Sequence, residues 1–298
     1  MILATPVGGS ASFVAGLKAM RVCRTVLACL LAMGLGLPWA AAQGVSLGAR
    51  HHAWARFKPG AWKLVRTVTE TLDDHGLVMS TSVTETKTTL TKIEADGVVL
   101  EVEVGIEVAG KQFDGQPQCI KQGFHGEPAN ANATVQPPVP AQLTIDDRKV
   151  DCYVEKVDFS AAHGHTSTSL YYSDSVAPYV LKRESTTTDP ETQTVLGTSS
   201  MEVVALEMPQ KVLSDIKNAA CLKIVQRHAK GTVVTLAMTN SDVPGGVVSH
   251  LSKETDKNGR LVCRSNLELL GYGTQPEEER GTVFGRKRPP RPRKSTAR

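Results

Sequence analysis

The sequence predicts a mainly β protein: a large curved antiparallel sheet, or half-barrel, made of repeated hairpins and covered by one short helix. Three observations lead to this prediction. Residues 178–204 recur 66 positions later, without a gap, as residues 244–270. A weaker third copy begins at Pro59 and carries one extra residue. Several other segments alternate apolar and polar side chains with the period of two that is typical of half-buried strands.

The first 42 residues have the pattern of a cleaved secretory signal. Three basic residues precede an apolar run over residues 26–38, and a run of alanines ends at Ala42. The apolar run is shorter than the roughly 20 residues that cross a bilayer as a helix. We therefore expect a secreted or periplasmic protein, cleaved after Ala42. Met1 and Met20 both remain open as the start.

The three repeats, over residues 59–92, 178–206 and 244–271, are each predicted to form a hairpin. Each opens at a proline, which is tolerated at the start of a strand, and continues through a polar turn into an alternating strand. Because side chains on a strand alternate between two faces, a slip of one residue would invert the faces. Aligning the copies predicts one shared, mostly aliphatic inner face, whose candidate ligand-binding residues are Leu77, Met79, Val83, Met201, Val203, Leu267 and Leu269.

The segments between the repeats complete the predicted sheet. Residues 98–108 alternate most regularly, and residues 116–140 form a polar, proline-rich connection. Strands resume at residues 150–159 and 166–172. The repeats and these strands form a single domain over residues 43–273.

Residues 209–220 are the one predicted helix. Val212, Leu213, Ile216 and Ala220 recur near the helical period, and Pro209 suits a first-turn position. We expect this helix to cover the shared aliphatic face, since an amphipathic helix needs an apolar partner surface.

The basic charge of the chain is concentrated at its two ends. Ten of the 34 basic residues lie in the signal and in residues 286–298, where no acidic residue occurs, so residues 43–285 carry a net charge of −6. This distribution argues against nucleic-acid binding, which places basic residues on the folded surface. Residues 274–298 are predicted to be a disordered basic tail, with an anionic envelope surface as one partner for it.

Four cysteines remain after removal of the signal. An even number in an oxidising compartment favours disulfides, and four cysteines allow three pairings. A bond between the first two would close the proline-rich connection, which makes that pairing the preferred one. The four candidates are Cys119, Cys152, Cys221 and Cys263.

Two kinds of short motif carry side chains that are used in metal binding or catalysis. His163 and His165 could supply half of a metal site, but an exposed turn is the commoner meaning of this pattern. The pairs Ser173-Asp174 and Ser241-Asp242 could include a nucleophile, but each precedes a Val and a Pro and suits a turn cap. The chain has no GxSxG, HExxH or phosphate-binding glycine loop. We therefore expect no enzyme activity, no metal and no cofactor.

In outline, residues 50–273 resemble the half-barrel of the outer-membrane lipoprotein carrier superfamily and its secreted relatives. The resemblance rests on long meandering antiparallel strands, a short covering helix and strand starts such as Ser241-Asp242-Val243-Pro244. It implies a curved sheet with a concave face that receives acyl chains. No family motif matches residue by residue, so no binding residue is carried over.

Two functional hypotheses follow from different classes. In the first, the protein is an exported, non-enzymatic envelope protein that binds an apolar ligand, an acyl chain or a lipoprotein, on the concave face of its sheet. In the second, that face is a filled core and the protein is a structural or protein-interaction module of the envelope. A third hypothesis is that the protein is a hydrolase.

Overall fold

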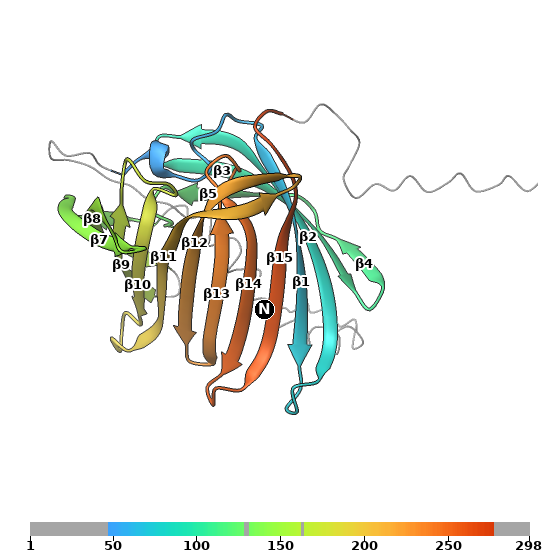
Figure 1. Cartoon of the computed structure of the whole chain (residues 1–298). Coiled ribbons are helices and arrows are strands. Elements are labelled where there is room, and N and C mark those ends of the chain that lie inside the picture. Colours follow the sequence, from blue (N-terminus) through green and yellow to red (C-terminus); the bar gives the residue numbers. More distant parts are fainter. Residues whose placement is uncertain (1–46, 128–130, 162–163, 277–298) are drawn as a thin grey trace, which may run out of the picture.

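A computed structural model describes residues 47–127, 131–161 and 164–276 of the chain (Figure 1). The predicted signal, the turn residue His163 and the basic tail from residue 277 onward lie outside these residues. A 3-10 turn, η1 (Ala49–His51), precedes the strands. The strands of the N-terminal half are β1 (Trp62–Leu72), β2 (Val78–Glu94), β3 (Gly97–Val108), β4 (Lys111–Asp114), β5 (Gln118–Gly123), β6 (Ala133–Val135) and β7 (Val139–Ile145). Those of the C-terminal half are β8 (Arg148–Ala161), β9 (Gly164–Tyr172), β10 (Val180–Thr188), β11 (Val195–Val212), β12 (Asp215–His228), β13 (Gly231–Thr239), β14 (Val247–Asp256) and β15 (Leu261–Gly273).

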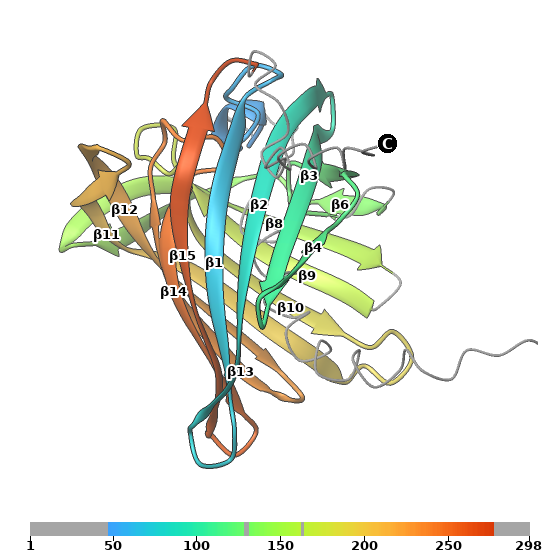
Figure 2. The ribbon, with the colours of Figure 1, turned by 90° about the vertical axis from the view of Figure 1, so that its right-hand side faces the viewer.

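All described strands belong to one antiparallel sheet in the order β4-β3-β2-β1-β15-β14-β13-β12-β11-β10-β9-β8-β6. β5 also pairs with β3, and β7 with β8. The pairing of β1 with β15 brings the first and last strands together within the sheet. Figure 2 shows the curvature that results, with β1 to β3 on one arm and β8 to β10 on the other. The prediction of a mainly β protein built on one large, open, curved sheet is confirmed.

Each of the three sequence repeats forms a hairpin, namely β1–β2, β10–β11 and β14–β15. Each hairpin also carries a bulge at the same place, shortly after its turn. The register passes over one residue of the returning strand, which is Met79 in the first hairpin, Leu196 in the second and Val262 in the third. A bulge sets two residues of one strand against one of its partner, so it shifts the alternation of faces by one residue.

The predicted helix at residues 209–220 was wrong. This segment is the end of β11 and the beginning of β12, paired from Met208 and Ala219 to Val212 and Asp215. Val212 is 2% exposed and packs on Val243 and Val248, whereas Ile216 is 70% exposed. A period of 3.6 and a period of 2 are hard to separate over so few residues, and pairing along the two long strands decided in favour of the hairpin.

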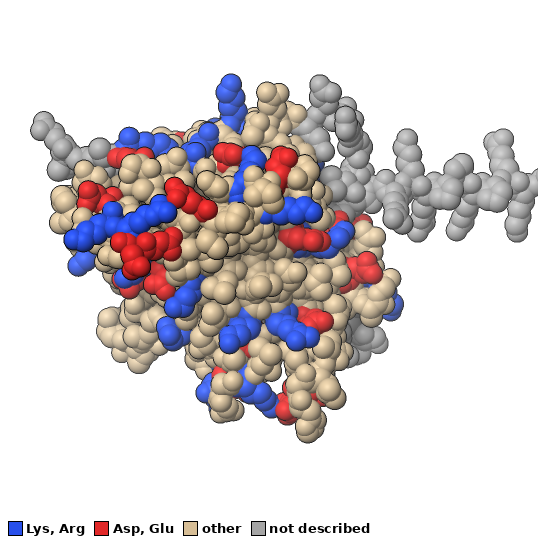
Figure 3. Space-filling model, viewed as in Figure 1, with Lys and Arg blue, Asp and Glu red and all other residues tan. Residues whose placement is uncertain are grey.

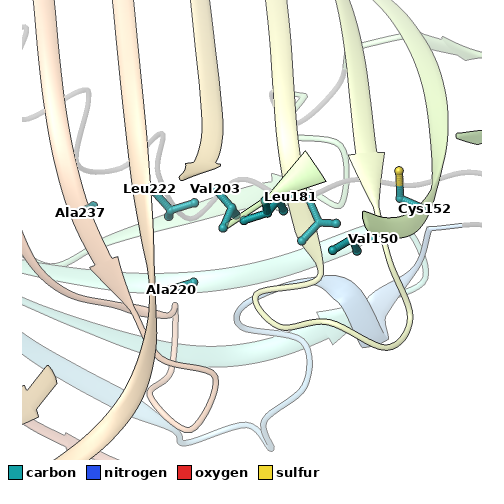
Figure 4. Packing of buried hydrophobic residues seen from close by; sticks show 8 residues of the cluster. Val150, Cys152, Leu181, Val203, Ala220, Leu222 and Ala237 are labelled. Carbon is teal, nitrogen blue, oxygen red and sulfur yellow. The ribbon is translucent and has the colours of Figure 1, made fainter. Parts of the chain in front are cut away.

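The aliphatic core joins strands that are far apart in the sheet order. One buried cluster takes side chains from β7, β8 and β10 to β13, seven of which are labelled in Figure 4. A second cluster, at the other arm, contains Trp54, Leu90, Val98 and Phe124. Burying each large aliphatic or aromatic side chain contributes about 1.5–3 kcal/mol, so these contacts favour the curved form of the sheet. The first cluster consists of Ile145, Val150, Cys152, Leu181, Val203, Ala220, Leu222 and Ala237.

Candidate functional site

The strand register divides the side chains of the central sheet between two faces. One row of directly paired residues runs across five strands, from β11 to β15, and its members are almost fully buried: Val203, Leu222, Ala237, His250 and Leu267. We call the face that carries this row the inner face and the opposite one the outer face. Met201 lies on the inner face two residues before Val203, and Leu269 lies two residues after Leu267. Four of the seven candidate binding residues therefore share the inner face.

The other three candidates, all in the first repeat, do not lie on the inner face as aligned. Val83 pairs with Val68, which pairs with Asn266, and this row belongs to the outer face. Leu77 and Met79 are 66% and 70% exposed beside the turn. The cause is a one-residue offset in the alignment: the equivalent bulges make Met79 equivalent to Leu196, whereas the sequence alignment matched Met79 with Gly197. The predicted common face was wrong by one residue in this copy.

In place of aliphatic side chains, the first repeat contributes hydroxyl groups to the inner face. Thr67, Thr69 and Thr71 on β1 pair with Thr84, Ser82 and Ser80 on β2. The hydroxyl-bearing surface continues across β15, β14 and β13 through the paired Ser265, Ser252 and Thr235. Thr235 Oγ1 donates a hydrogen bond to Ser252 Oγ at 2.8 Å. The inner face is thus amphipathic, aliphatic toward β11 and hydroxyl-rich toward β2. Once the bulge is placed, the alternating Ser and Thr of residues 80–84 would have revealed this character.

Several buried polar atoms of the inner face have no hydrogen-bond partner among the described residues. These atoms are both ring nitrogens of His250, Glu254 Oε2 and Ser265 Oγ. The three side chains are 2%, 8% and 7% exposed, respectively. Burial lowers the pKa of His250 to about 4, helped by the nearby charge of Lys63, and burial raises the pKa of Glu254. Buried polar groups are normally paired, so these groups need an explanation.

Two cations face the same side of the sheet. Lys63 Nζ donates to the backbone oxygen of Gly245 at 3.4 Å and lies 5.6 Å from the centre of the Trp54 ring. Desolvation lowers the pKa of Lys63 to about 8. Arg183, between Met201 and Leu170 in the register, has its pKa lowered to about 10 by desolvation, partly offset by the charge of Glu127. Both shifts follow from the burial of these two cations on the inner face.

The outer face is a different surface. Figure 3 shows basic and acidic side chains interspersed on the side of the molecule seen in Figure 1. Cross-strand ion pairs account for part of this pattern, including Arg66 with Glu85 at 2.8 Å and Lys223 with Glu202 at 3.1 Å. Mixed, mostly exposed charges of this kind are typical of a solvated face and stabilise little.

The two Ser-Asp motifs are part of loops that hold the N-terminal segment. Asp174 Oδ1 accepts a hydrogen bond from His51 Nε2 at 2.6 Å, while His51 Nδ1 accepts one from the backbone N–H of Gly48. In the second loop the backbone N–H of Gly245 donates to Ala53 O at 2.9 Å. Both nitrogens of His51 are therefore occupied and neither is available as a base.

Ser173 caps its own turn. Its hydroxyl donates to Asp151 O at 3.0 Å and accepts from the backbone N–H of Ser175 at 3.4 Å. In the second loop the same role falls to Asn240, whose Oδ1 accepts the backbone N–H of Asp242 at 2.9 Å. Neither motif assembles the nucleophile, base and oxyanion donors that a serine hydrolase requires.

No disulfide joins the four cysteines within the described chain. Cys119 lies on β5 and Cys152 on β8, and the preferred pairing of these two cysteines stays a prediction. Cys221 pairs with Met238 on the outer face, whereas Cys263 pairs with Glu254 on the inner face. No group of three or more metal-ligating side chains occurs among the described residues.

No protein-family model matches the chain, and no curated protein matches it either. Solved structures do match. One, from Bacteroides fragilis, is described as a "putative exported protein with YmcC-like fold"; it is 9% identical, with a TM-score of 0.31, over 73% of this chain and 97% of that one. A "putative lipoprotein" from Parabacteroides distasonis is 13% identical, with a TM-score of 0.29, over 72% and 97% of the two chains.

A third structure, a DUF1329 family protein from Desulfovibrio piger, is 7% identical, with a TM-score of 0.29, over 72% of this chain and 85% of that one. In the part of the chain that is described, no helix is long and apolar enough to cross a membrane.

Proposed function

We propose that this is an exported, non-enzymatic protein of the cell envelope that binds the acyl chain of a lipid or lipoprotein on the inner face of its sheet. The N-terminal signal pattern supports export. In this proposal the basic tail contacts an anionic envelope surface.

The observation that carries the binding proposal is the composition of the inner face. The aliphatic side chains of Met201, Val203 and Leu267 lie on the same face as buried polar atoms of His250, Glu254 and Ser265 that the described chain leaves without hydrogen bonds. Ligand sites are typically mostly apolar with a few convergent polar groups. A face used only as a core would be expected to pair its polar groups internally.

The second candidate function is a structural or protein-interaction module. It is favoured by the close packing of the cluster around Leu181 and Val203, which are 1% and 6% exposed. In that case the inner face is an ordinary interior, and the partner surface lies elsewhere.

Native mass spectrometry of the protein purified from its host cells, combined with titration by the neutral probe Nile red, separates the two candidates. We expect a co-purifying amphiphile, or saturable Nile red binding that an added lipid displaces. Absence of both, in protein shown to be folded by circular dichroism, would exclude the binding function and favour the structural one.

A matched pair of variants locates the binding. Met201→Asp places a charge on the inner face, and Leu251→Asp places one on the outer face, where Leu251 is 63% exposed. Met201→Asp is expected to abolish Nile red binding, and Leu251→Asp to leave it unchanged. Equal effects of the two substitutions would place the binding elsewhere.

A further inference from the structure

Buried and half-buried polar side chains of the inner face form a continuous stripe along β14 and β15. His250, Ser252 and Glu254 are alternate residues of β14 and therefore point to the same side. Ser265 lies directly opposite Ser252. At about 3.4 Å per residue, the stripe from His250 to Glu254 is about 14 Å long.

Both ring nitrogens of His250 and Oε2 of Glu254, at the two ends of the stripe, have no hydrogen-bond partner among the described residues. His250 stands between Leu267 and Ala237, both apolar. Glu254 stands between Cys263 and Val233. The hydroxyl of Ser252 is engaged by Thr235, but the Ser265 hydroxyl has no partner among the described residues. An unpaired buried polar group destabilises a protein by about 1–3 kcal/mol, so several on one stripe suggest that something else pairs with them.

The charges around the stripe oppose a charged occupant. At one end of the stripe, the positive charge of Lys63 helps to lower the pKa of His250. At the other end, burial raises the pKa of the Glu254 carboxyl, and the charges of His228 and Lys230 partly offset this rise. A charged headgroup that spans the whole stripe would have a group of its own sign near one end, because Lys63 lies near His250 and the Glu254 carboxyl lies at the other end. The His250 imidazole, held neutral by its low pKa, offers one donor and one acceptor. Neutral imidazole, hydroxyl and carboxyl groups together match a ligand that both donates and accepts hydrogen bonds without a net charge.

We propose that His250, Ser265 and Glu254 form a subsite for the uncharged, hydroxyl-bearing headgroup of an amphiphile, such as a sugar. The inference rests on the proposed function, because the aliphatic residues beside the stripe would hold the chain of the same molecule. It adds the chemical class of the headgroup, which the apolar residues alone do not specify.

Displacement of Nile red from the purified protein by amphiphiles of one chain length tests the subsite. The probes are dodecyl maltoside, dodecanoate and dodecyltrimethylammonium, each below its micelle-forming concentration. Dodecyl maltoside is expected to displace the dye at a concentration at least about tenfold lower than either charged probe. Equal displacement by all three would overturn the subsite but leave the acyl-binding function standing, whereas absence of dye binding would overturn both.

Variants assign the preference to particular groups. His250→Leu keeps a side chain of similar size, removes the unpaired nitrogens and should weaken dodecyl maltoside binding about tenfold, with Nile red binding changed less than twofold. A histidine that is merely tolerated in a core would instead give a higher Tm with no change in headgroup preference, and that result would overturn the assignment.

Ser265→Ala provides a second test that removes only one oxygen atom. We expect it to weaken dodecyl maltoside binding about threefold to tenfold, as loss of a single hydrogen bond does. Ser249→Ala is the matched control, because Ser249 pairs with Glu268 on the outer face. If both serine variants behave alike, Ser265 does not contact the headgroup.

Discussion

At the scale of single residues, the most perturbed carboxyl group of the inner face is that of Glu155. The side chain is 0% exposed, its Oε1 accepts a hydrogen bond from Tyr172 Oη at 3.0 Å, and its Oε2 has no partner in the described chain. Burial raises the pKa of Glu155 to about 7. The folded protein therefore binds the carboxyl proton of Glu155 more tightly than the unfolded chain does.

This shift predicts a pH dependence of stability that a single substitution removes. The contribution of Glu155 is fully present below about pH 4.5 and is lost as the pH rises through about 7, where the folded protein must ionise a buried carboxyl. Glu155→Gln keeps the acceptor for Tyr172 and cannot ionise. At pH 8 the variant should be more stable than the wild type by on the order of 3 kcal/mol, with little difference at pH 4.5.

Urea unfolding at several pH values measures this effect. Glu191→Gln is the control, since Glu191 is exposed in the β10–β11 turn and should leave the pH dependence as it is. Parallel stability curves for wild type and Glu155→Gln between pH 4.5 and 8 would mean that the Glu155 carboxyl is not desolvated.

At the scale of elements, the three equivalent bulges decide which side chains face inward. In the first hairpin the bulge places Thr84 of β2 on the inner face, opposite Thr67, and Val83 on the outer face, opposite Val68, although hydrophobicity alone favours the opposite arrangement. Thr67 is 3% exposed and stands between Leu267 and Thr84.

Adjacent substitutions on β1 test this register. Thr67→Lys should destabilise the protein by more than about 3 kcal/mol because it buries a charge beside Leu267, whereas Val68→Lys should change stability by less than about 1 kcal/mol. Chemical denaturation of both variants gives the comparison. A larger loss for Val68→Lys would show that the faces of β1 are reversed.

The segment at residues 209–220 shows where local pattern fails at this scale. Val212, Leu213, Ile216 and Ala220 fit a helical stripe, yet Val212 packs on Val243 and Val248 while Leu213 takes a positive φ of 55° at the hairpin turn. The long ladder between β11 and β12 satisfies the backbone in a way that an isolated helix of 12 residues, marginal by itself, could not rival.

At the scale of the whole molecule, the fold gives the cysteines different exposures. Cys119 is exposed on β5, at one arm, while Cys152 is buried on β8, at the other. Burial raises the pKa of the Cys152 and Cys221 thiols, which makes both less reactive.

Thiol chemistry on the folded protein is therefore predictable. Iodoacetamide should modify Cys119 first, as read by peptide mass spectrometry, and a reducing agent should leave the Tm unchanged. Cys119→Ser, which removes the exposed thiol, should abolish the fast phase of labelling. A fall in Tm on reduction would instead reveal a disulfide.

The sequence by itself determined the class of fold and its hairpins. The 66-residue repeat and the period-two alternation identified β1–β2, β10–β11 and β14–β15 as hairpins, because turn residues and alternation are local properties of the chain. The same alternation placed Met201, Val203 and Leu267 on one face. These features depend on neighbours within a few residues, which a sequence displays directly.

Only the tertiary structure decided what the inner face contains. The position of a bulge depends on pairing between strands, so the inward turn of Thr67 and Thr84 could not be read from composition. The burial of His250 and Glu254 likewise depends on curvature that joins strands far apart in sequence. The alternation of side chains shows that each strand has two faces. Pairing across the whole sheet determines which face is enclosed and which polar groups are buried on it.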